Sequence, residues 1–103
     1  MIVKKLYASE YIDKACFNAK TVFCTYPDGS IYAWNMKEGE LLYTFKGHDE
    51  KITDIIMVND STFATCSYDC TVVIWDSLKG VSTHVFKFKD TVKQMILIKN
   101  FLY

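Results

Sequence analysis

The sequence has no excess of charge of either sign. Its 12 basic residues balance 12 acidic residues, so the formal net charge is zero. An excess of lysine and arginine marks proteins that bind nucleic acids or anionic membranes, and we therefore expect no nucleic-acid partner and no membrane partner. No apolar run approaches the ~20 residues of a membrane-spanning helix, and the first residues lack the apolar core of a secretory signal. These absences predict a cytoplasmic or nuclear protein.

Motifs that carry enzyme chemistry are also absent. The sequence contains neither a G-x-S-x-G turn nor a glycine-rich loop of the kinds that hold phosphates. Cys66 and Cys70 form an isolated C-x3-C pair, whereas zinc sites usually combine such a pair with a second one or with histidines. We expect no metal and no cofactor, and we interpret the cysteines as free thiols that fill the core.

What the chain does contain is a regular series of short apolar segments, which is typical of an all-β domain. Half of its residues are apolar and 16% are aromatic, and the apolar runs recur about every eight to twelve residues between turn-forming residues. No window shows the 3.6-residue apolar period of a helix. The expected strands are Ile2–Tyr7, Tyr11–Phe17, Thr21–Thr25, Ile31–Asn35, Leu41–Phe45, Ile52–Val58, Thr62–Ser67, Thr71–Trp75, Ser82–Phe88, Thr91–Ile98 and a further one starting at Phe101.

An internal repeat underlies this pattern. A shift of 41 residues places "YPDGSIYAWNMKEGELLYTFKG" on "SYDCTVVIWDSLKGVSTHVFKF". Asp28 then meets Asp69 and Trp34 meets Trp75, and "DTVKQMILIKNFLY" resembles the start of a third copy. Units of about forty residues with four short strands each are typical of repeat folds in which neighbouring units pack on one another.

The segment "GHDEKITDIIMVNDSTFATCSYDCTVVIWD", residues 47–76, resembles the WD-repeat family, whose units run from a Gly-His pair to a Trp-Asp pair. This resemblance implies antiparallel four-stranded blades of a β-propeller. We expect a leading strand and loop in residues 1–10, a degenerate blade in 11–46, a well-matched blade in 47–88 and the start of a third blade in 89–103. Since a ring needs about four to eight blades, we interpret the chain as an incomplete propeller: an incomplete gene product, a fragment, or one part of a ring completed by another chain.

The resemblance also implies a hydrogen-bond network inside the second blade. It would link His48, Asp69 and the indole of Trp75 through a strand hydroxyl, for which we choose Ser67 with Thr65 as the alternative. The first blade would keep only part of this network. Its members would be Asp28 and Trp34.

Three residues of the second blade also admit a different interpretation. Ser67, His48 and Asp69 are the residue types of a hydrolase triad, but the tryptophan spacing and the repeat favour a structural network, so we expect no enzyme activity.

Cys70 stands where the first unit has Gly29, and we expect it in a turn that requires a positive φ.

Propellers of this family usually bind partners at loops beside the histidine and the turn. Transferred to this sequence, those positions are Lys51, Thr53 and Tyr68, and Tyr68 is a residue type enriched at interface hot spots. We expect a scaffold that presents this surface to protein or peptide partners. The alternative is a structural fragment that self-associates through exposed blade faces, or completes a propeller with another chain, without a binding activity of its own.

Overall fold

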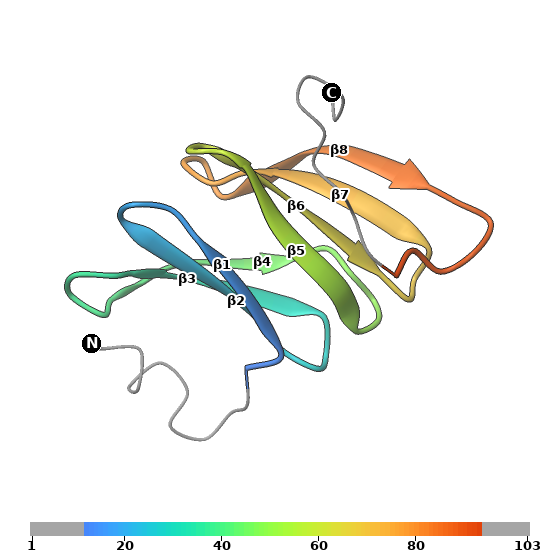
Figure 1. Ribbon diagram of the computed structural model, residues 1–103, viewed down its shortest axis with the longest axis horizontal. Coiled ribbons are helices and arrows are strands. Elements are labelled where there is room, and N and C mark those ends of the chain that lie inside the picture. The colour runs from blue at the N-terminus through green and yellow to red at the C-terminus, as the bar shows by residue number, and fades with distance from the viewer. Residues whose placement is uncertain (1–11, 94–103) are drawn as a thin grey trace.

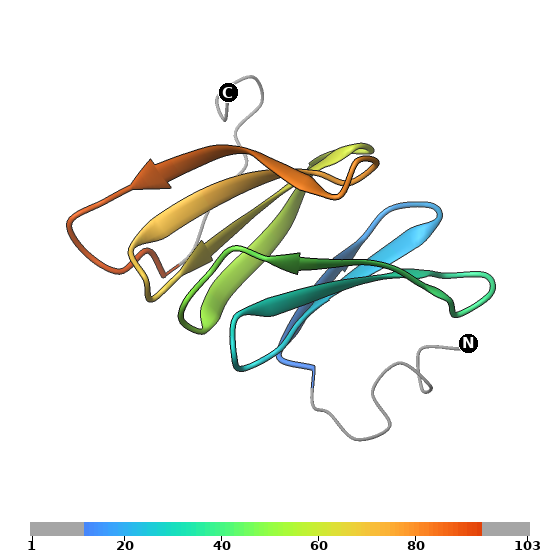
Figure 2. The ribbon, with the colours of Figure 1, turned by 180° about the vertical axis from the view of Figure 1, so that it is seen from behind.

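The structure is a computed structural model that describes residues 12–93. It contains eight strands: β1 Lys14–Phe17, β2 Thr21–Thr25, β3 Ser30–Asn35, β4 Leu41–Lys46, β5 Ile52–Asn59, β6 Thr62–Ser67, β7 Thr71–Asp76 and β8 Val81–Lys87. They form two antiparallel four-stranded sheets, ordered β1-β2-β3-β4 and β5-β6-β7-β8. Figures 1 and 2 show these sheets from opposite sides.

The expected all-β class with four-stranded antiparallel units is confirmed. The strand expected at Tyr11–Phe17 is shorter, because β1 begins at Lys14 and residues 12 and 13 precede it. Asp13 still donates its backbone N–H to the Thr25 carbonyl at 2.8 Å. Tyr11 lies outside the described residues. The expected strand Thr91–Ile98 is not formed at residues 91–93, and its remainder lies outside the described residues, as do the expected strands Ile2–Tyr7 and the start at Phe101. Residues 12–93 contain no helix that could cross a membrane.

The repeat extends to the pairing of individual residues. Trp34 lies opposite Val22 across β2 and β3, and Trp75 lies opposite Phe63 across β6 and β7, at the same offset of 41 residues. The ladder shifts directly before each tryptophan, between Ala33 and Trp34 in one sheet and between Ile74 and Trp75 in the other. Two sheets with the same register therefore carry equivalent side chains on equivalent faces.

The turn after each of these tryptophan strands is built in the same way. Asn35 accepts hydrogen bonds from the backbone N–H groups of Lys37 and Glu38, at 2.9 and 2.8 Å. Asp76 makes the corresponding bonds, and a glycine with positive φ follows in both turns. Amide and carboxylate oxygens both accept such bonds, so asparagine replaces aspartate here without loss of the turn.

The core lies between the facing surfaces of the two sheets. Phe23 and Phe45 of the first sheet pack on Phe63 of the second, with ring centroids 4.5 and 5.3 Å apart, and Phe45 also contacts Trp75 at 5.3 Å. All four side chains are at most 4% exposed. Burial of a large apolar side chain contributes roughly 1.5–3 kcal/mol, so this contact is the main support of the pair of sheets. The loop 47–51 connects the two sheets.

Candidate functional site

A chain of polar side chains is buried at the end of the second sheet where β5 begins. The His48 Nε2 atom lies 2.6 Å from the Thr65 hydroxyl oxygen, and the Trp75 indole N–H donates to the same oxygen at 2.9 Å. On its other side, the His48 Nδ1 atom lies 2.9 Å from a carboxylate oxygen of Asp69. One buried hydroxyl on β6 thus links the strand β7 to the loop before β5.

The donors and acceptors of this network assign the histidine tautomer. Because the ionised Asp69 carboxylate can only accept, the hydrogen bond between it and His48 Nδ1 needs the proton on Nδ1. In a neutral ring Nε2 is then bare and accepts from the Thr65 hydroxyl, whose oxygen accepts from Trp75. The proton of the neutral ring lies on Nδ1, where it is donated to the Asp69 carboxylate. Every polar atom along this path has a partner, which is the condition for burying such groups without a large cost.

Asp69 holds the turn between β6 and β7 as well as the histidine. One carboxylate oxygen accepts from the Asp49 N–H at 3.1 Å, and the other accepts from the Thr71 N–H at 3.0 Å and from the Thr71 hydroxyl. Burial alone would raise the pKa of Asp69, but the hydrogen bonds from Thr71, His48 and Asp49 outweigh it and hold this pKa below its ordinary value. The carboxylate is therefore ionised at neutral pH and fixes two segments that are far apart in the sequence.

The choice of Ser67 as the network hydroxyl is wrong, and the correct residue is Thr65. The Ser67 hydroxyl is directed to the loop instead, within hydrogen-bond distance of the carbonyls of Glu50 and Lys51, at 3.1 and 2.9 Å. It also accepts from the Asp69 N–H at 3.1 Å. Trp75 lies opposite Phe63, so the same-face hydroxyl within its reach is two residues along β6 rather than four.

The same contacts bear on the hydrolase interpretation. Ser67 is completely buried, and its hydroxyl has backbone partners rather than His48. A serine nucleophile needs its base within hydrogen-bond reach, and the Ser67 hydroxyl makes no such bond to His48.

The cysteine thiols are not poised for reaction either. Burial raises the pKa of Cys16 to about 12 and that of Cys24 to about 11, so these thiols are far from the reactive thiolate form. Within residues 12–93 there is no group of three or more potential metal ligands.

Gly47 has a steric role beside this network. A Cβ atom at this position would lie 2.5 Å from the Trp75 ring, well inside normal contact distance. The His48 ring follows directly and lies edge-on to the same indole, with centroids 6.5 Å apart. A Gly-His pair therefore fits here because its first residue must lie flat on the tryptophan and its second must reach Thr65.

The first sheet retains the outline of this arrangement but not its bonds. Cys24 stands at the position of Thr65, and the buried Trp34 indole N–H has no hydrogen-bond partner among residues 12–93. Asp28 accepts from the Ser30 N–H at 2.9 Å and lies 3.9 Å from the Lys46 ammonium. Hydrogen bonds from Ser30 lower the pKa of Asp28, which remains exposed. Asp28 thus shapes its own turn and does not form a network with Trp34.

The exposed surface above the network is formed by the β6–β7 turn and the loop 47–51. Tyr68 is 49% exposed, and its N–H donates to the Lys51 carbonyl at 3.1 Å. The Lys51 side chain is also exposed, 3.9 Å from an Asp13 carboxylate oxygen. Cys70 closes the turn with a φ of 70°, in the left-handed region that we expected for the position of Gly29. Tyr68 and Lys51 are therefore neighbours on a turn with a tightly specified backbone.

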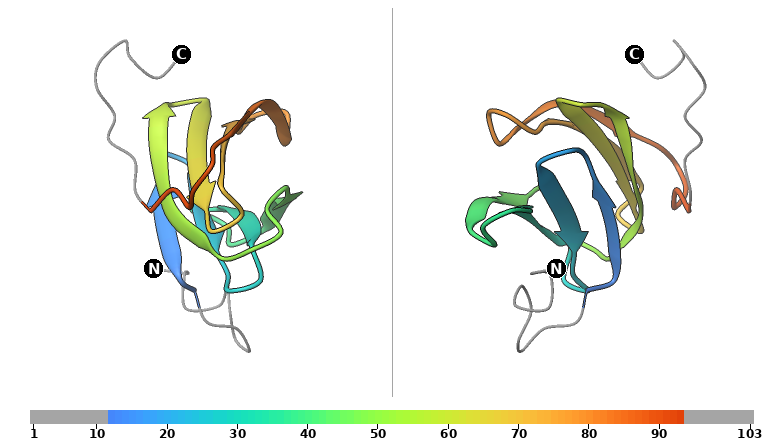
Figure 3. Two further views of the ribbon diagram at one scale, coloured as in Figure 1. Left: turned by 90° about the vertical axis from the view of Figure 1, so that its right-hand side faces the viewer. Right: turned by 60° about the vertical axis from the view of Figure 1, so that its left-hand side comes forward.

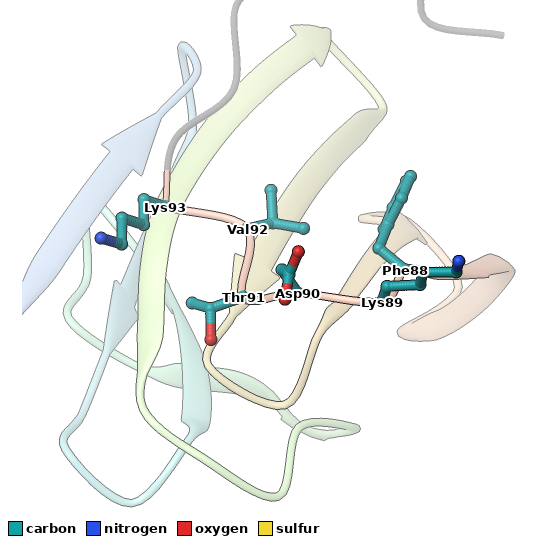
Figure 4. Close-up of a pocket in the computed structure, with 6 residues that line it drawn as sticks. All are labelled: Phe88, Lys89, Asp90, Thr91, Val92 and Lys93. Carbon is teal, nitrogen blue, oxygen red and sulfur yellow. The ribbon is translucent and has the colours of Figure 1, made fainter.

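The third residue of the expected binding surface lies in a different environment. The Thr53 hydroxyl donates to the Val92 carbonyl and contacts the Cys66 sulfur at 3.2 Å, and its side chain is only partly exposed. The segment 88–93 crosses this end of the second sheet from β8 to β5, as Figure 3 shows. Its side chains line a shallow hollow (Figure 4). Phe88 anchors the segment through a 2.8 Å hydrogen bond to the Cys70 carbonyl, so the hollow adjoins the Tyr68 turn.

Comparison with known proteins agrees with this geometry. The sequence profile of the family "WD domain, G-beta repeat" matches residues 39–76. The chain is 33% identical over 81 residues to WD repeat-containing protein 41 of Mus musculus, covering 70% of this chain and 18% of that protein. The chain is a partial member of the WD-repeat family.

Two further relatives cover different shares of the chain. Autophagy-related protein 16 of Arabidopsis thaliana is 25% identical over 101 residues, covering 93% of this chain and 20% of that protein. Small ribosomal subunit protein RACK1 of Dictyostelium discoideum is 31% identical over 73 residues, covering 64% of this chain and 22% of the relative. The chain thus spans about a fifth of the length of these relatives.

Two solved structures show the fold. The β-propeller domain of Cps50 (Swd1) from Myceliophteria thermophila superimposes with a TM-score of 0.77 at 18% identity, over 84% of this chain and 27% of that one. The computationally designed Ika8 protein gives 0.77 at 21% identity, over 86% and 28%. The two sheets are therefore propeller blades, and within residues 12–93 they do not close a ring. WD-repeat propellers are generally non-enzymatic scaffolds.

Proposed function

We propose that this WD-repeat segment is a non-enzymatic scaffold module that presents the Tyr68 turn to protein or peptide partners. The observation that carries the proposal is the placement of Tyr68, which is 49% exposed directly beside the buried network. Tyrosine combines a large apolar ring with a hydroxyl that can bond to a partner, and it is enriched at binding hot spots.

A fixed backbone supports this role because it lowers the entropic cost of binding. The Tyr68 N–H is bonded to Lys51, and the next residue, Asp69, is held by four hydrogen bonds to its carboxylate and one to its N–H. A loop that is already ordered does not lose further backbone freedom when a partner arrives. Tyr68 is therefore displayed at a defined position rather than on a mobile loop.

The charges around Tyr68 favour a polar partner surface. Lys51 lies on one side of the turn, while Asp49 and Glu50 expose carboxylates from the same loop. Mixed charge around one aromatic residue resembles the polar rim and aromatic centre of protein interfaces. The relative RACK1 is named as a protein of the small ribosomal subunit, and this name supports a role within a protein assembly.

A peptide selection tests the proposal on the Tyr68 turn itself. The chain is immobilised, a displayed library of random peptides is selected on it, and the enriched peptides are measured against purified variants. We expect Tyr68→Ala to weaken binding by about tenfold or more, as expected for a hot-spot residue of ~2 kcal/mol. Lys51→Ala should weaken binding less, because a charge at a rim contributes less than a central aromatic residue.

Leu78→Ala is the matched control. Leu78 is 70% exposed in the turn between β7 and β8, at the end of the second sheet away from the β6–β7 turn. This variant should bind the selected peptides as the parent chain does. Peptides whose binding is unchanged by Tyr68→Ala but lost in Leu78→Ala would overturn the proposed location of the site.

A further inference from the structure

The turn between β2 and β3 of the first blade lies against the loop 47–51, which precedes β5 (Figure 1). Gly29 makes this contact. A Cβ atom on Gly29 would lie 2.7 Å from the Glu50 carbonyl oxygen and 2.8 Å from that of His48. Both oxygens belong to the backbone and cannot rotate away as a side chain could. A side chain at position 29 would therefore displace one of the two segments.

The repeat shows that this close approach, and not the backbone conformation alone, requires a glycine. Cys70 occupies the position of Gly29 in the second blade, and both residues are left-handed, with φ of 70° and 90°. The second blade thus carries a side chain at a turn position where the first blade has none. A left-handed φ costs a non-glycine residue some strain but does not exclude it, so space is what position 29 lacks.

The turn around Gly29 is held in shape by the first blade. The Gly29 N–H donates to the Tyr26 carbonyl at 3.0 Å, and the Tyr26 N–H donates to the Ser30 carbonyl at 3.0 Å. The Ser30 N–H donates in turn to the Asp28 carboxylate at 2.9 Å. Tyr26, Gly29 and Ser30 are buried. A turn that is bonded and buried in this way is a firm support for the loop packed on it.

The loop carries this support on to the Tyr68 turn. The Glu50 carbonyl, which the first blade contacts, lies 3.1 Å from the Ser67 hydroxyl, and that hydroxyl accepts from the Asp69 N–H at 3.1 Å. The following carbonyl, that of Lys51, accepts from the Tyr68 N–H at 3.1 Å. The two N–H groups at and after Tyr68 therefore depend on the position of the loop backbone.

A second contact joins the first blade to the same loop. An Asp13 carboxylate oxygen lies 3.9 Å from the Lys51 ammonium, and the Asp13 N–H is bonded to the Thr25 carbonyl at 2.8 Å. The segment before β1 and the turn after β2 thus both reach the loop that carries Lys51.

We propose that Gly29 is a positioning residue of the binding surface: through it the first blade fixes the loop 47–51, and the loop fixes the Tyr68 turn. The surface is then built by two blades, although its exposed residues all follow the first blade in the sequence. The consequence for binding rests on the proposed function, whereas the positioning itself can be measured without a partner.

Two-dimensional nitrogen–proton NMR of the full chain tests the positioning directly. Gly29→Ala should shift the amide signals of Tyr68 and Asp69, because the acceptors of both N–H groups move with the loop. Gly39→Ala is the matched control, since Gly39 has a similar left-handed φ of 73° but lies between β3 and β4, at the other end of the first sheet. It should leave both signals in place. Unchanged signals in Gly29→Ala, or equal shifts in the two variants, would overturn the inference.

A milder pair of variants decides if Gly29→Ala loses its cooperative melting. Asp28→Ala removes the acceptor of the Ser30 N–H and loosens the turn without adding atoms. Asn35→Ala does the same to the turn at the other end of β3, where Asn35 accepts from two backbone N–H groups. Only Asp28→Ala should move the Tyr68 signal. The inference fails if neither variant moves it or if both move it equally.

Peptide binding then measures the consequence for function. Peptides whose binding depends on Tyr68 should bind Gly29→Ala about threefold or more weakly, because fewer molecules hold the turn in the competent arrangement. They should bind Gly39→Ala as they bind the parent chain. If the selection yields no peptide that depends on Tyr68, the proposed function fails, and the NMR comparison still decides the positioning. Shifted Tyr68 signals with unchanged binding of such peptides would contradict a role of Gly29 in the binding surface.

Discussion

Replacement of Thr65 by valine is the sharpest perturbation of the buried network. Valine preserves the branched shape of threonine but has no hydroxyl, and the site is completely buried, so water cannot take its place. The Trp75 N–H loses an acceptor at 2.9 Å, and His48 Nε2 loses a donor at 2.6 Å. Two buried polar atoms are left without partners by the loss of a single oxygen.

The expected cost follows from the number of groups that lose their partners. Each buried polar group that loses its partner costs ~1–3 kcal/mol, so the two groups that Thr65→Val leaves without partners should lower the free energy of unfolding by about 2–6 kcal/mol. Because small domains have a total stability of ~5–15 kcal/mol, this is a large fraction. With a urea slope of ~2 kcal/mol per molar, in the middle of the usual range, the unfolding midpoint should fall by about 1–3 M.

Urea unfolding followed by tryptophan fluorescence, at one fixed protein concentration, measures this cost. Ser67→Ala is the informative comparison, because it removes the acceptor of one N–H donor, the Asp69 N–H, and should cost ~1–3 kcal/mol, about half as much. Thr44→Val removes an exposed strand hydroxyl and should change stability by less than ~0.5 kcal/mol. The reasoning is refuted if Thr65→Val costs no more than Ser67→Ala.

Three further changes test other parts of the account. Gly47→Ala should destabilise the chain by about 1–3 kcal/mol through overpacking against Trp75, and an unchanged melting temperature would contradict the steric role of this glycine. Cys24→Thr should stabilise it by about 0.5–1.5 kcal/mol, because it offers the unpartnered Trp34 indole N–H an acceptor; thermal melting that shows no gain would mean that the hydroxyl does not reach the ring. The pKa of Asp69 is held low in the folded chain, so its contribution to stability is complete above the ordinary aspartate pKa and is lost as the pH falls through the lowered value. Asp69→Asn should therefore weaken the acid dependence of urea unfolding, and an unaltered pH profile would argue against that pairing.

Much of the fold could be predicted from the sequence because the repeat and the strand pattern support each other. The segments between turns are apolar on successive residues, a pattern that is typical of strands in sheets covered on both faces. The left-handed conformation of Cys70 was predictable because it shares a turn position with Gly29. The start of the first strand was not predictable, since Ile12 and Asp13 continue the strand-like composition before Lys14 but lie outside the ladder.

The residues of the buried network were predictable only in part, for a geometric reason. Ser67 and Thr65 both lie on the face of β6 that carries Phe63, so composition and alternation do not distinguish them. The pairing of Phe63 with Trp75 decides between them, because each additional pair of residues moves a hydroxyl ~7 Å further along the strand. That register becomes visible only in the structure.

The environment of Thr53 was also hidden from the sequence. It depends on the segment 88–93, which returns across the end of the second sheet and places the Val92 carbonyl on the Thr53 hydroxyl. A contact between residues 39 positions apart that is made through a backbone carbonyl leaves no signature in side-chain composition. Tyr68 and Lys51 keep the exposure that a binding role requires.

The His48 ring offers the most direct test of the central claim, that one continuous chain of hydrogen bonds holds the second blade together. Long-range nitrogen–proton NMR correlation at about pH 8, where an ordinary imidazole is neutral, reports which ring nitrogen carries the proton. The account predicts a single tautomer with the proton on Nδ1, facing Asp69, and a bare Nε2 facing Thr65. A proton on Nε2, or the averaged signals of a freely exchanging imidazole, would contradict it.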